Sequence, residues 1–208
     1  MKVLLINGSP RAKGCTFTAL SEVASELEKQ GIETRIFQIG NQAVAGCIGC
    51  RACRSKHPGR CFRDDIVNEA LAIVPEYDGF VFGSPVYYAA ASGQMSAFLD
   101  RFFFAGGASM VNKPGAAIVS CRRGGATAAF DELNKYFTIS SMPIVSSIYW
   151  NQVHGSSAED VKQDFEGMQT MRQLGRNMAW MLKCFEAGRA AGIPYPEVEP
   201  RIWTNFIR

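Results

Sequence analysis

The first eighteen residues, MKVLLINGSPRAKGCTFT, constrain the fold more than any other part of the sequence. Val3 to Ile6 form a short apolar run with β-branched residues. Such a run is too short for a buried helix and is typical of a central parallel strand. Asn7-Gly8-Ser9-Pro10 ends the run, and apolar residues at helical spacing begin at Phe17. The sequence therefore predicts a strand, a loop of small residues and a helix in close succession.

This strand–loop–helix arrangement is typical of an anion-binding site. The first turn of a helix has unpaired N–H groups, and the positive end of the helix dipole faces the loop. Ser9, Thr16 and Thr18 add hydroxyl donors, while Arg11 and Lys13 add positive charge. The alternative is an ordinary turn whose hydroxyl residues cap a helix, since the loop carries neither GxGxxG nor Gly-Lys-Ser/Thr. If the loop binds an anion, we expect a phosphate monoester.

Composition narrows the class of protein. The chain has 208 residues, 47% hydrophobic and 20% charged, as expected for one globular domain with a sizeable core. A net charge of +3 gives no indication of nucleic-acid binding. The N-terminus does not follow the pattern of a signal peptide, and no apolar stretch approaches the roughly 18 residues of a membrane span. We therefore expect a cytoplasmic protein, free of disulfides, that binds neither nucleic acid nor membrane.

The rest of the chain alternates predicted strands and helices. Besides 3–6, we expect strands at 34–39, 80–82, 115–121 and 144–149. We expect helices at 17–30, from Asp64 or Asp65 to about 74, around 95–103, at 126–137 and at 158–191. In the last helix the residues expected to face the core are Val161, Phe165, Met168, Met178, Leu182 and Phe185. Five strands in this order predict an α/β fold with an open parallel sheet covered on both faces.

The predicted domain spans residues 1–192. Residues 40–63 have no helical or strand period and form a cysteine-rich loop inserted after the second strand. Residues 193–208 are rich in proline and are predicted to pack on the domain or on a partner subunit, with Trp203 and Phe206 as anchors.

Three loops at strand ends form the predicted binding site, because ligands of such sheets bind at the carboxyl ends of the strands. The loops are 8–18, 83–93 and 120–126. Tyr87 and Tyr88 suit contact with a flat ring, although packing on a neighbouring helix would also explain them. The third loop offers the N–H groups of Gly124 and Gly125 and two arginines, Arg122 and Arg123. A ligand with one phosphate and one planar heterocycle fits, and FMN fits better than a dinucleotide because no acidic residue ends the second strand.

Over about residues 1–150, the sequence resembles the NADPH-dependent FMN reductase branch of the flavodoxin-like superfamily. The resemblance rests on Gly8-Ser9-Pro10-Arg11 with Thr16 and Thr18, on Gly83-Ser84-Pro85-Val86-Tyr87-Tyr88, and on Gln94, Phe98, Leu99, Asp100 and Arg101. It implies a flavodoxin-like three-layer sandwich with a five-stranded parallel sheet. It also implies a homodimer or homotetramer, with the helix after the second loop at the interface.

The resemblance further implies which residues bind FMN. The phosphate would be bound by Ser9, Arg11, Thr16, Phe17 and Thr18. The isoalloxazine ring would be lined by Pro85, Val86, Tyr87, Tyr88, Ser120, Arg123, Gly124 and Gly125. Cys15 departs from the family pattern, because it stands where relatives often have Asn, so one contact before Thr16 would be lost.

Four cysteines, Cys47, Cys50, Cys53 and Cys61, have the spacing C-x2-C-x2-C-x7-C. This spacing can place four thiolates around one 4Fe–4S cluster, and it resembles the compact motif of the iron–sulfur flavoproteins of the same superfamily. Zinc is a chemical alternative, although C-x2-C-x2-C strains a single tetrahedral ion. The other alternative is a loop without metal, in which nearby arginines and lysine lower the thiol pKa values.

The remaining cysteines and the two histidines carry less information. Cys121 and Cys184 are predicted to be buried as small hydrophobic residues, whereas Cys15 could be buried or reactive. His57 and His154 have no acidic partner at a useful spacing, and we expect His154 in a surface loop. The sequence thus contains neither a Ser-His-Asp nor a Cys-His arrangement, and no catalytic side chain is expected.

These observations predict an FMN-dependent NAD(P)H oxidoreductase that passes electrons from a nicotinamide cofactor through bound FMN to a small acceptor, such as a flavin or a quinone. The alternative is an iron–sulfur flavoprotein that carries electrons, with a 4Fe–4S cluster on the four cysteines and ferredoxin as its electron donor. A third class is a thiol-based redox sensor or binding module that uses the basic cysteine loop without turnover.

Overall fold

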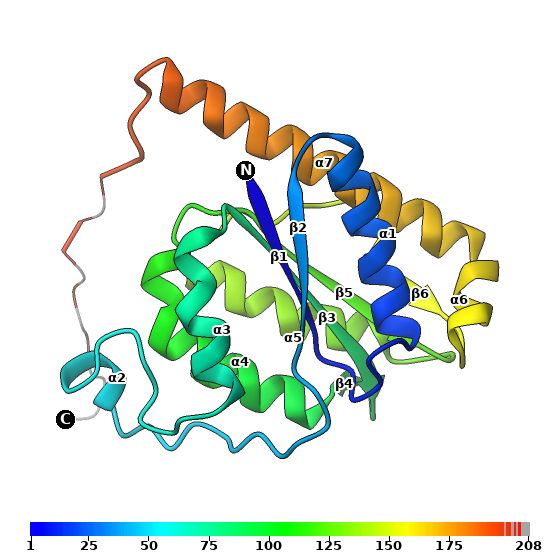
Figure 1. The fold of residues 1–208 in the computed structure, drawn as a ribbon, viewed down its shortest axis with the longest axis horizontal. Coiled ribbons are helices and arrows are strands. Elements are labelled where there is room, and N and C mark those ends of the chain that lie inside the picture. Colours follow the sequence, from blue (N-terminus) through cyan, green and yellow to red (C-terminus); the bar gives the residue numbers. More distant parts are fainter. Residues whose placement is uncertain (198, 201, 203, 205–208) are drawn as a thin grey trace.

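The computed structural model describes residues 1–197, 199, 200, 202 and 204. Its centre is a sheet of five parallel strands in the order β2-β1-β3-β5-β6 (Figure 1). The strands are β1 (Lys2–Asn7), β2 (Glu33–Gln38), β3 (Gly79–Tyr87), β5 (Gly115–Cys121) and β6 (Gln152–His154). This order confirms the predicted flavodoxin-like α/β fold. Trp203 and Phe206, predicted to anchor the C-terminal segment, lie outside the described residues.

Helices cover both faces of the sheet (Figure 1). One face is covered by α1 (Cys15–Lys29), α6 (Ala158–Gln163) and α7 (Phe165–Ala190). The other is covered by α3 (Ile66–Ile73), α4 (Gly93–Gly106) and α5 (Ala126–Ile139). Two 3-10 turns, η1 (Val74–Glu76) and η2 (Gly107–Met110), follow α3 and α4. In the part of the chain that the structure describes, no helix combines the length and apolarity needed to cross a bilayer.

Successive residues of a strand point to opposite faces, and this divides the core in two. Leu4 and Ile6 of β1 pack with α3 and α4, whereas Val3 and Leu5 pack with α1 and α7. The central strands are therefore apolar on both sides, which explains the continuous hydrophobic runs in the sequence.

The prediction of a strand at 144–149 is wrong. Ile144 forms only an isolated bridge with Gly115, and the edge strand is β6, at 152–154. The side chain of Ser147 donates to Asn151 Oδ1 at 2.6 Å and closes a turn, and Asn151 Nδ2 donates to the carbonyl of Ala117 at 3.1 Å. These polar contacts lift residues 146–150 away from the sheet, so Ile148, Tyr149 and Trp150 are exposed.

The helix predicted at 158–191 is two helices, because Asp164 ends α6 and caps α7. Its carboxylate accepts a hydrogen bond from the N–H of Gly167 at 2.9 Å. The break turns Phe165 outward, where it is 73% exposed, so its predicted place in the core is wrong. Phe185 is half-buried, whereas the other four predicted core residues of this segment are buried. Cys184, also predicted to be buried, is exposed on α7.

Two further differences concern loops. Val86 and Tyr87, predicted in a loop, continue β3 and pair antiparallel with β4 (Ala90–Ala91). Tyr88 and Ala89 form the turn of this hairpin with φ values of 51° and 59°. A short helix, α2 (Ala52–Ser55), interrupts the cysteine segment, for which no regular structure was predicted.

Glu26 links α1 to α7, and its charge contributes to stability. Its carboxylate accepts hydrogen bonds from Lys29 Nζ at 2.5 Å and from Arg176 Nε at 2.8 Å, and its side chain is 5% exposed. The hydrogen bond from Lys29, supported by Arg176 and opposed by burial, lowers the pKa of Glu26 from its ordinary value of 4.5. The stabilisation is therefore present above the unfolded pKa and is lost as the pH falls through the folded pKa.

We expect Glu26→Gln to lower the free energy of unfolding by about 1 kcal/mol at neutral pH, because both partner cations are more than half exposed. Urea unfolding at neutral pH and at about pH 3 would measure this difference. The free energies of unfolding of the wild type and the variant should converge at the acidic pH. Glu33→Gln, which removes a carboxylate on the surface, is the control and should change stability by less than about 0.5 kcal/mol. An equal loss at both pH values would contradict the assigned role of the Glu26 charge.

Candidate functional site

A cleft of about 190 Å³, called the main cleft below, lies at the carboxyl ends of the parallel strands. Four segments contribute to it: the loop after β1 with the start of α1, the hairpin that ends β3, the end of β5, and the loop after β6. The lining residues are Ser9, Arg11, Cys15, Thr16, Pro85, Val86, Tyr87, Ser120, Cys121, Arg122, Gly155 and Ser156.

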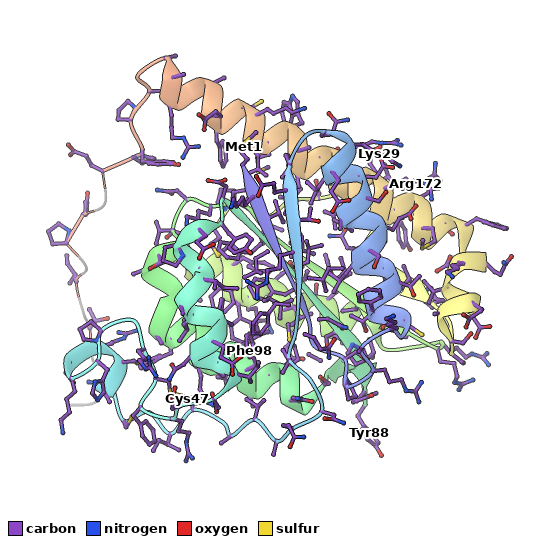
Figure 2. All side chains as sticks on the ribbon, in the orientation of Figure 1. Met1, Lys29, Cys47, Tyr88, Phe98 and Arg172 are labelled. Carbon is purple, nitrogen blue, oxygen red and sulfur yellow. The ribbon has the colours of Figure 1, made fainter. Side chains whose placement is uncertain are left out.

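The cleft brings together seven of the predicted site residues, which are Ser9, Arg11, Thr16, Pro85, Val86, Tyr87 and Ser120. Phe17 and Thr18 do not line it, and the Thr18 hydroxyl donates to the carbonyl of Gly14 at 3.1 Å. Tyr88 is fully exposed and projects from the hairpin tip (Figure 2). The full exposure of Tyr88 excludes the alternative that it packs on a neighbouring helix, whereas Tyr87 is half exposed and lines the cleft.

The third predicted loop, 120–126, lies only partly in the cleft, because Ser120, Cys121 and Arg122 line it whereas the next three residues lie beside it. Arg123 and Gly124 are exposed. Gly125 has a φ of 90° and is packed against Ala89, so that an added Cβ would lie 2.8 Å from the Ala89 Cα. Gly125 is therefore required by the close approach of the hairpin turn to the start of α5, and this structural role is sufficient to explain it.

The start of α1 has the features of an anion-binding site. Gly14 occupies the N-cap position and carries no side chain that could accept from the first turn. Helix geometry leaves the N–H groups of Cys15, Thr16 and Phe17 without intrahelical acceptors, and these groups lie at the positive end of the helix. The guanidinium of Arg11 lies in the same loop and lines the cleft. These donors fit a phosphate group.

A polar network fixes the loop before α1. Asn7 Oδ1 accepts from the N–H of Ser9 at 3.1 Å, and Asn7 Nδ2 donates to Gln38 Oε1 at 2.5 Å. Gln38 Nε2 in turn donates to the Ser9 carbonyl at 2.7 Å. Deeper in the cleft, the Thr16 and Ser120 hydroxyl oxygens lie 2.8 Å apart and connect α1 to β5. The cleft is therefore preformed by hydrogen bonds between loops that are distant in sequence.

Sequence reasoning gave no binding role to four lining residues, namely Cys15, Cys121, Gly155 and Ser156, whereas Arg122 is one of the two arginines predicted to contribute from the third loop. Gly155 and Ser156 follow β6, so the misplaced fifth strand concealed a fourth loop at the sheet edge. A Gly-Ser pair after a Val-containing strand was the available signal. Burial raises the pKa of the Cys15 and Cys121 thiols, so both are neutral at physiological pH.

A second site is formed by the cysteine segment at the other end of α4. Cys47, Cys50, Cys53 and Cys61 line one small cavity together with Ile48, Phe62, Phe104 and Arg101. Figure 2 shows Cys47 on the segment that runs below α3 and α4. Positive φ values of 66° at Gly49 and 59° at Arg51 bend the chain so that α2 brings Cys53 to the cavity. The Arg101 Nε lies 3.3 Å from the Cys61 Sγ.

The donor set of this cavity is restricted to thiols, because no carboxylate or imidazole is among its lining residues. Thiolates arranged around one cavity suit an iron–sulfur cluster, which is held by four cysteines. Within the described ranges, no three His, Cys, Asp or Glu side chains are arranged to hold a single metal ion. Burial raises the pKa of Cys53, contrary to the prediction that the basic residues would lower it.

Both ends of the cysteine segment are tied to α4. Gln94 Nε2 donates to the carbonyls of Gly40 at 2.8 Å and of Gln42 at 3.0 Å. At the other end of the helix, Arg101 bonds to the carbonyls of Ala45 and Arg63. The helix that begins beside the main cleft thus also positions the cysteine cavity.

His154 is neither isolated nor in a surface loop, contrary to both predictions, because it ends strand β6 and contacts Asp164. The main-chain N–H of His154 donates to Asp164 Oδ2 at 2.6 Å, and the ring Nδ1 lies 3.6 Å from the same oxygen. The pair borders a small cavity with Tyr149 and Glu166 and does not line the main cleft. The contact with Asp164 orders the junction between β6 and α7, and His154 remains outside the candidate site.

The sequence is similar to that of proteins of a known family. Residues 1–156 match the family described as NADPH-dependent FMN reductase. An iron–sulfur flavoprotein of Methanocaldococcus jannaschii is 34% identical over 191 residues, which covers 88% of this chain and 98% of that protein. An iron–sulfur flavoprotein of Methanosarcina thermophila is 29% identical over 194 residues and covers 91% and 99% of the two chains.

Solved structures agree on the fold. An archaeal flavodoxin superposes with a TM-score of 0.60 at 14% identity, over 88% of this chain and 99% of that one. The apo form of an NADH:FMN oxidoreductase gives a TM-score of 0.57 at 15% identity, over 88% and 89%. The extent of the family match, together with the M. jannaschii relative, shows that this flavodoxin-like chain belongs to the NADPH-dependent FMN reductase family.

Proposed function

We propose that this protein is an iron–sulfur flavoprotein that carries electrons between FMN in the main cleft and a 4Fe–4S cluster on Cys47, Cys50, Cys53 and Cys61. The observation that carries the proposal is that all four thiols line one cavity. Iron–sulfur flavoproteins that match nearly the full chain support it further. These findings favour this function, given above as the alternative, over NAD(P)H oxidation as the main activity.

In the proposed flavin site, the amides of Cys15, Thr16 and Phe17 and the guanidinium of Arg11 would hold the phosphate. Pro85, Val86 and Tyr87 would form one wall of the slot for the ring, and Ser120 and Cys121 the inner end. FMN supplies the ability to take up and release one or two electrons. The polypeptide binds and orients it, and the neutral thiols of Cys15, which is partly buried, and Cys121, which is buried, add no charge near the ring.

In the proposed cluster site, the four thiolates would be the ligands. A bound cluster supplies one-electron transfer. Ile48, Phe62 and Phe104 border the cavity and would give the cluster apolar neighbours, which affects the reduction potential. Ferredoxin is the proposed electron donor, and a homodimer or homotetramer is the proposed assembly.

A second candidate function is the NAD(P)H-dependent reduction of a small acceptor through FMN. The observation that favours it is the exposed hairpin, in which Tyr87 is 50% exposed beside the cleft, leaving room for a second planar ring. The family description, NADPH-dependent FMN reductase, points the same way.

Purification without oxygen, followed by absorbance spectroscopy and assays of iron, acid-labile sulfide and FMN, tests the proposal. We expect one FMN and about four iron and four sulfide per chain, as a 4Fe–4S cluster requires. FMN without iron, combined with steady NADPH consumption, would instead support the second candidate. Protein that binds neither group after reconstitution would contradict both functions.

Replacement of Arg11 by alanine should weaken FMN binding by about fivefold to tenfold, because one phosphate-facing charge at a partly exposed site is lost. Titration of FMN-free protein, followed by quenching of flavin fluorescence, would measure the Kd. Lys13→Ala is the matched control, since Lys13 is an exposed cation of the same loop that does not line the cleft. Equal losses of affinity in the two variants would indicate a general effect of charge instead of a contact.

A further inference from the structure

Arg101 is the largest fully buried side chain among the described residues, with 2% exposure. It lies on α4, whose other buried residues include Phe98 and Phe102. Removing a guanidinium from water is costly unless its donors are satisfied and its charge is paired. A buried arginine on this helix face therefore requires a specific reason.

The hydrogen bonds of Arg101 supply this reason. Asp65 takes two of them, from Nη1 at 2.6 Å and from Nη2 at 2.9 Å, and balances the charge. The other three go to the cysteine segment, from Nη1 to the Ala45 carbonyl at 3.2 Å, from Nη2 to the Arg63 carbonyl at 3.1 Å, and from Nε to Cys61 Sγ at 3.3 Å. These five bonds equal the number of guanidinium N–H groups.

The side chain of Asn68, on α3, binds the main chain of Cys61. Its Oδ1 accepts from the N–H of Cys61 at 2.9 Å, and its Nδ2 donates to the Cys61 carbonyl at 3.0 Å. Asn68 thus fixes the backbone of Cys61, whereas Arg101 contacts its sulfur. In the part of the chain that the structure describes, no other side chain donates a hydrogen bond to the sulfur of Cys47, Cys50, Cys53 or Cys61.

We propose that Arg101 is a positioning residue that orients the Cys61 thiolate toward the cavity and raises the reduction potential of the cluster bound there. This inference rests on the proposed function. Reduction by one electron adds one negative charge to the cluster and its thiolates. A buried positive charge that donates a hydrogen bond to a ligand sulfur stabilises this more negative state more strongly than the oxidised state. The bond from Nε to Cys61 Sγ therefore favours reduction.

The variant that tests this is Arg101→Lys, which keeps a positive charge but lacks the planar arrangement of donors that reaches Cys61, Asp65 and both carbonyls together. Asn68→Ala is the matched control, because it loosens the Cys61 backbone and leaves the Arg101 side chain in place. Both variants are compared with the wild-type holoprotein after anaerobic cluster reconstitution. Dithionite supplies the electron, and cluster absorbance gives the midpoint potential.

We expect Arg101→Lys to shift the equilibrium between oxidised and reduced cluster at least tenfold toward the oxidised form, a fall of about 59 mV for one electron. Asn68→Ala should lower the iron content but leave the potential of the remaining clusters unchanged. A wild-type potential in Arg101→Lys, or an equal fall in both variants, would overturn the proposal. Thermal unfolding of each variant shows whether it is folded.

Asp65→Asn provides an independent measurement if Arg101→Lys does not fold. This variant keeps Arg101 and a side-chain oxygen to cap α3, but removes the negative charge that balances the guanidinium. The potential should therefore rise, and a fall would overturn the proposal. Wild-type protein that binds no cluster would overturn the proposed function and this inference together, whereas a bound cluster with a potential insensitive to Arg101 would overturn this inference alone.

Discussion

Replacing Cys50 with alanine is expected to abolish stable iron binding and to leave FMN bound at the wild-type ratio. A 4Fe–4S cluster needs four protein ligands, and the cavity contains four thiols. Cys50 is exposed, so the change should alter the free energy of unfolding by less than about 0.5 kcal/mol. The main cleft includes none of these four cysteines, and its flavin should be unaffected.

Iron, sulfide and FMN analysis of the anaerobically purified variant would measure this effect. Cys184→Ala is the matched control, because Cys184 is also an exposed cysteine but lies on α7, outside the cavity. Iron retained in the Cys50 variant, or lost in the Cys184 variant, would contradict the assignment of the ligands. Loss of FMN together with iron would show that the two sites are not independent.

Replacing Phe82 with alanine should produce a large loss of stability, about 3–5 kcal/mol. Phe82 is fully buried on β3, and its ring centroid lies 5.4 Å from that of Phe103 and 5.6 Å from that of Phe137. Truncation would leave a cavity where β3, α4 and α5 meet, and close packing allows only partial collapse around it. Urea unfolding of the apo protein would give the free-energy difference.

Phe165→Ala is the control for this prediction, because the same atoms are removed from a side chain that is 73% exposed. We expect a change within about 0.5 kcal/mol. A loss of several kcal/mol at Phe165 would mean that the exposed α7 face is covered in solution, for example by a second copy of the chain. A loss below about 1 kcal/mol at Phe82 would be incompatible with the packing described.

Sequence patterns predicted the central strands because these are buried on both faces, and such strands are continuous apolar runs between glycines and prolines. They failed at the edge. The strand β6 has three residues, and its position depends on Asn151, a polar side chain that bonds to the Ala117 carbonyl. Residues 144–149 resemble a strand more than β6 does when only their hydrophobicity is considered. A hydrophobic pattern gives no information about a turn that is closed by a hydrogen bond between Ser147 and Asn151.

The candidate sites were predictable to a similar degree. Loops at strand ends identify where a ligand binds, but the direction of each side chain depends on tertiary contacts. Thr16 faces Ser120 across the cleft, whereas Thr18, two residues later, bonds back to its own helix. The spacing of the four cysteines indicated a common site. The link from Arg101 to Cys61 could not be predicted, because it joins residues 40 positions apart on different elements.

The attachment of the cysteine segment to α4 has a consequence for how the family can vary. Gln94 and Arg101 hold the segment near both of its ends, so the residues between these attachments form a closed loop. The length of this loop can change without displacing the elements to which its ends are attached. The entropy of closing such a loop changes slowly, by about 0.6 kcal/mol for each doubling of length. Insertions or deletions between Cys53 and Cys61 therefore cost little in stability, so the third spacing of the motif can change while the flavin cleft stays intact.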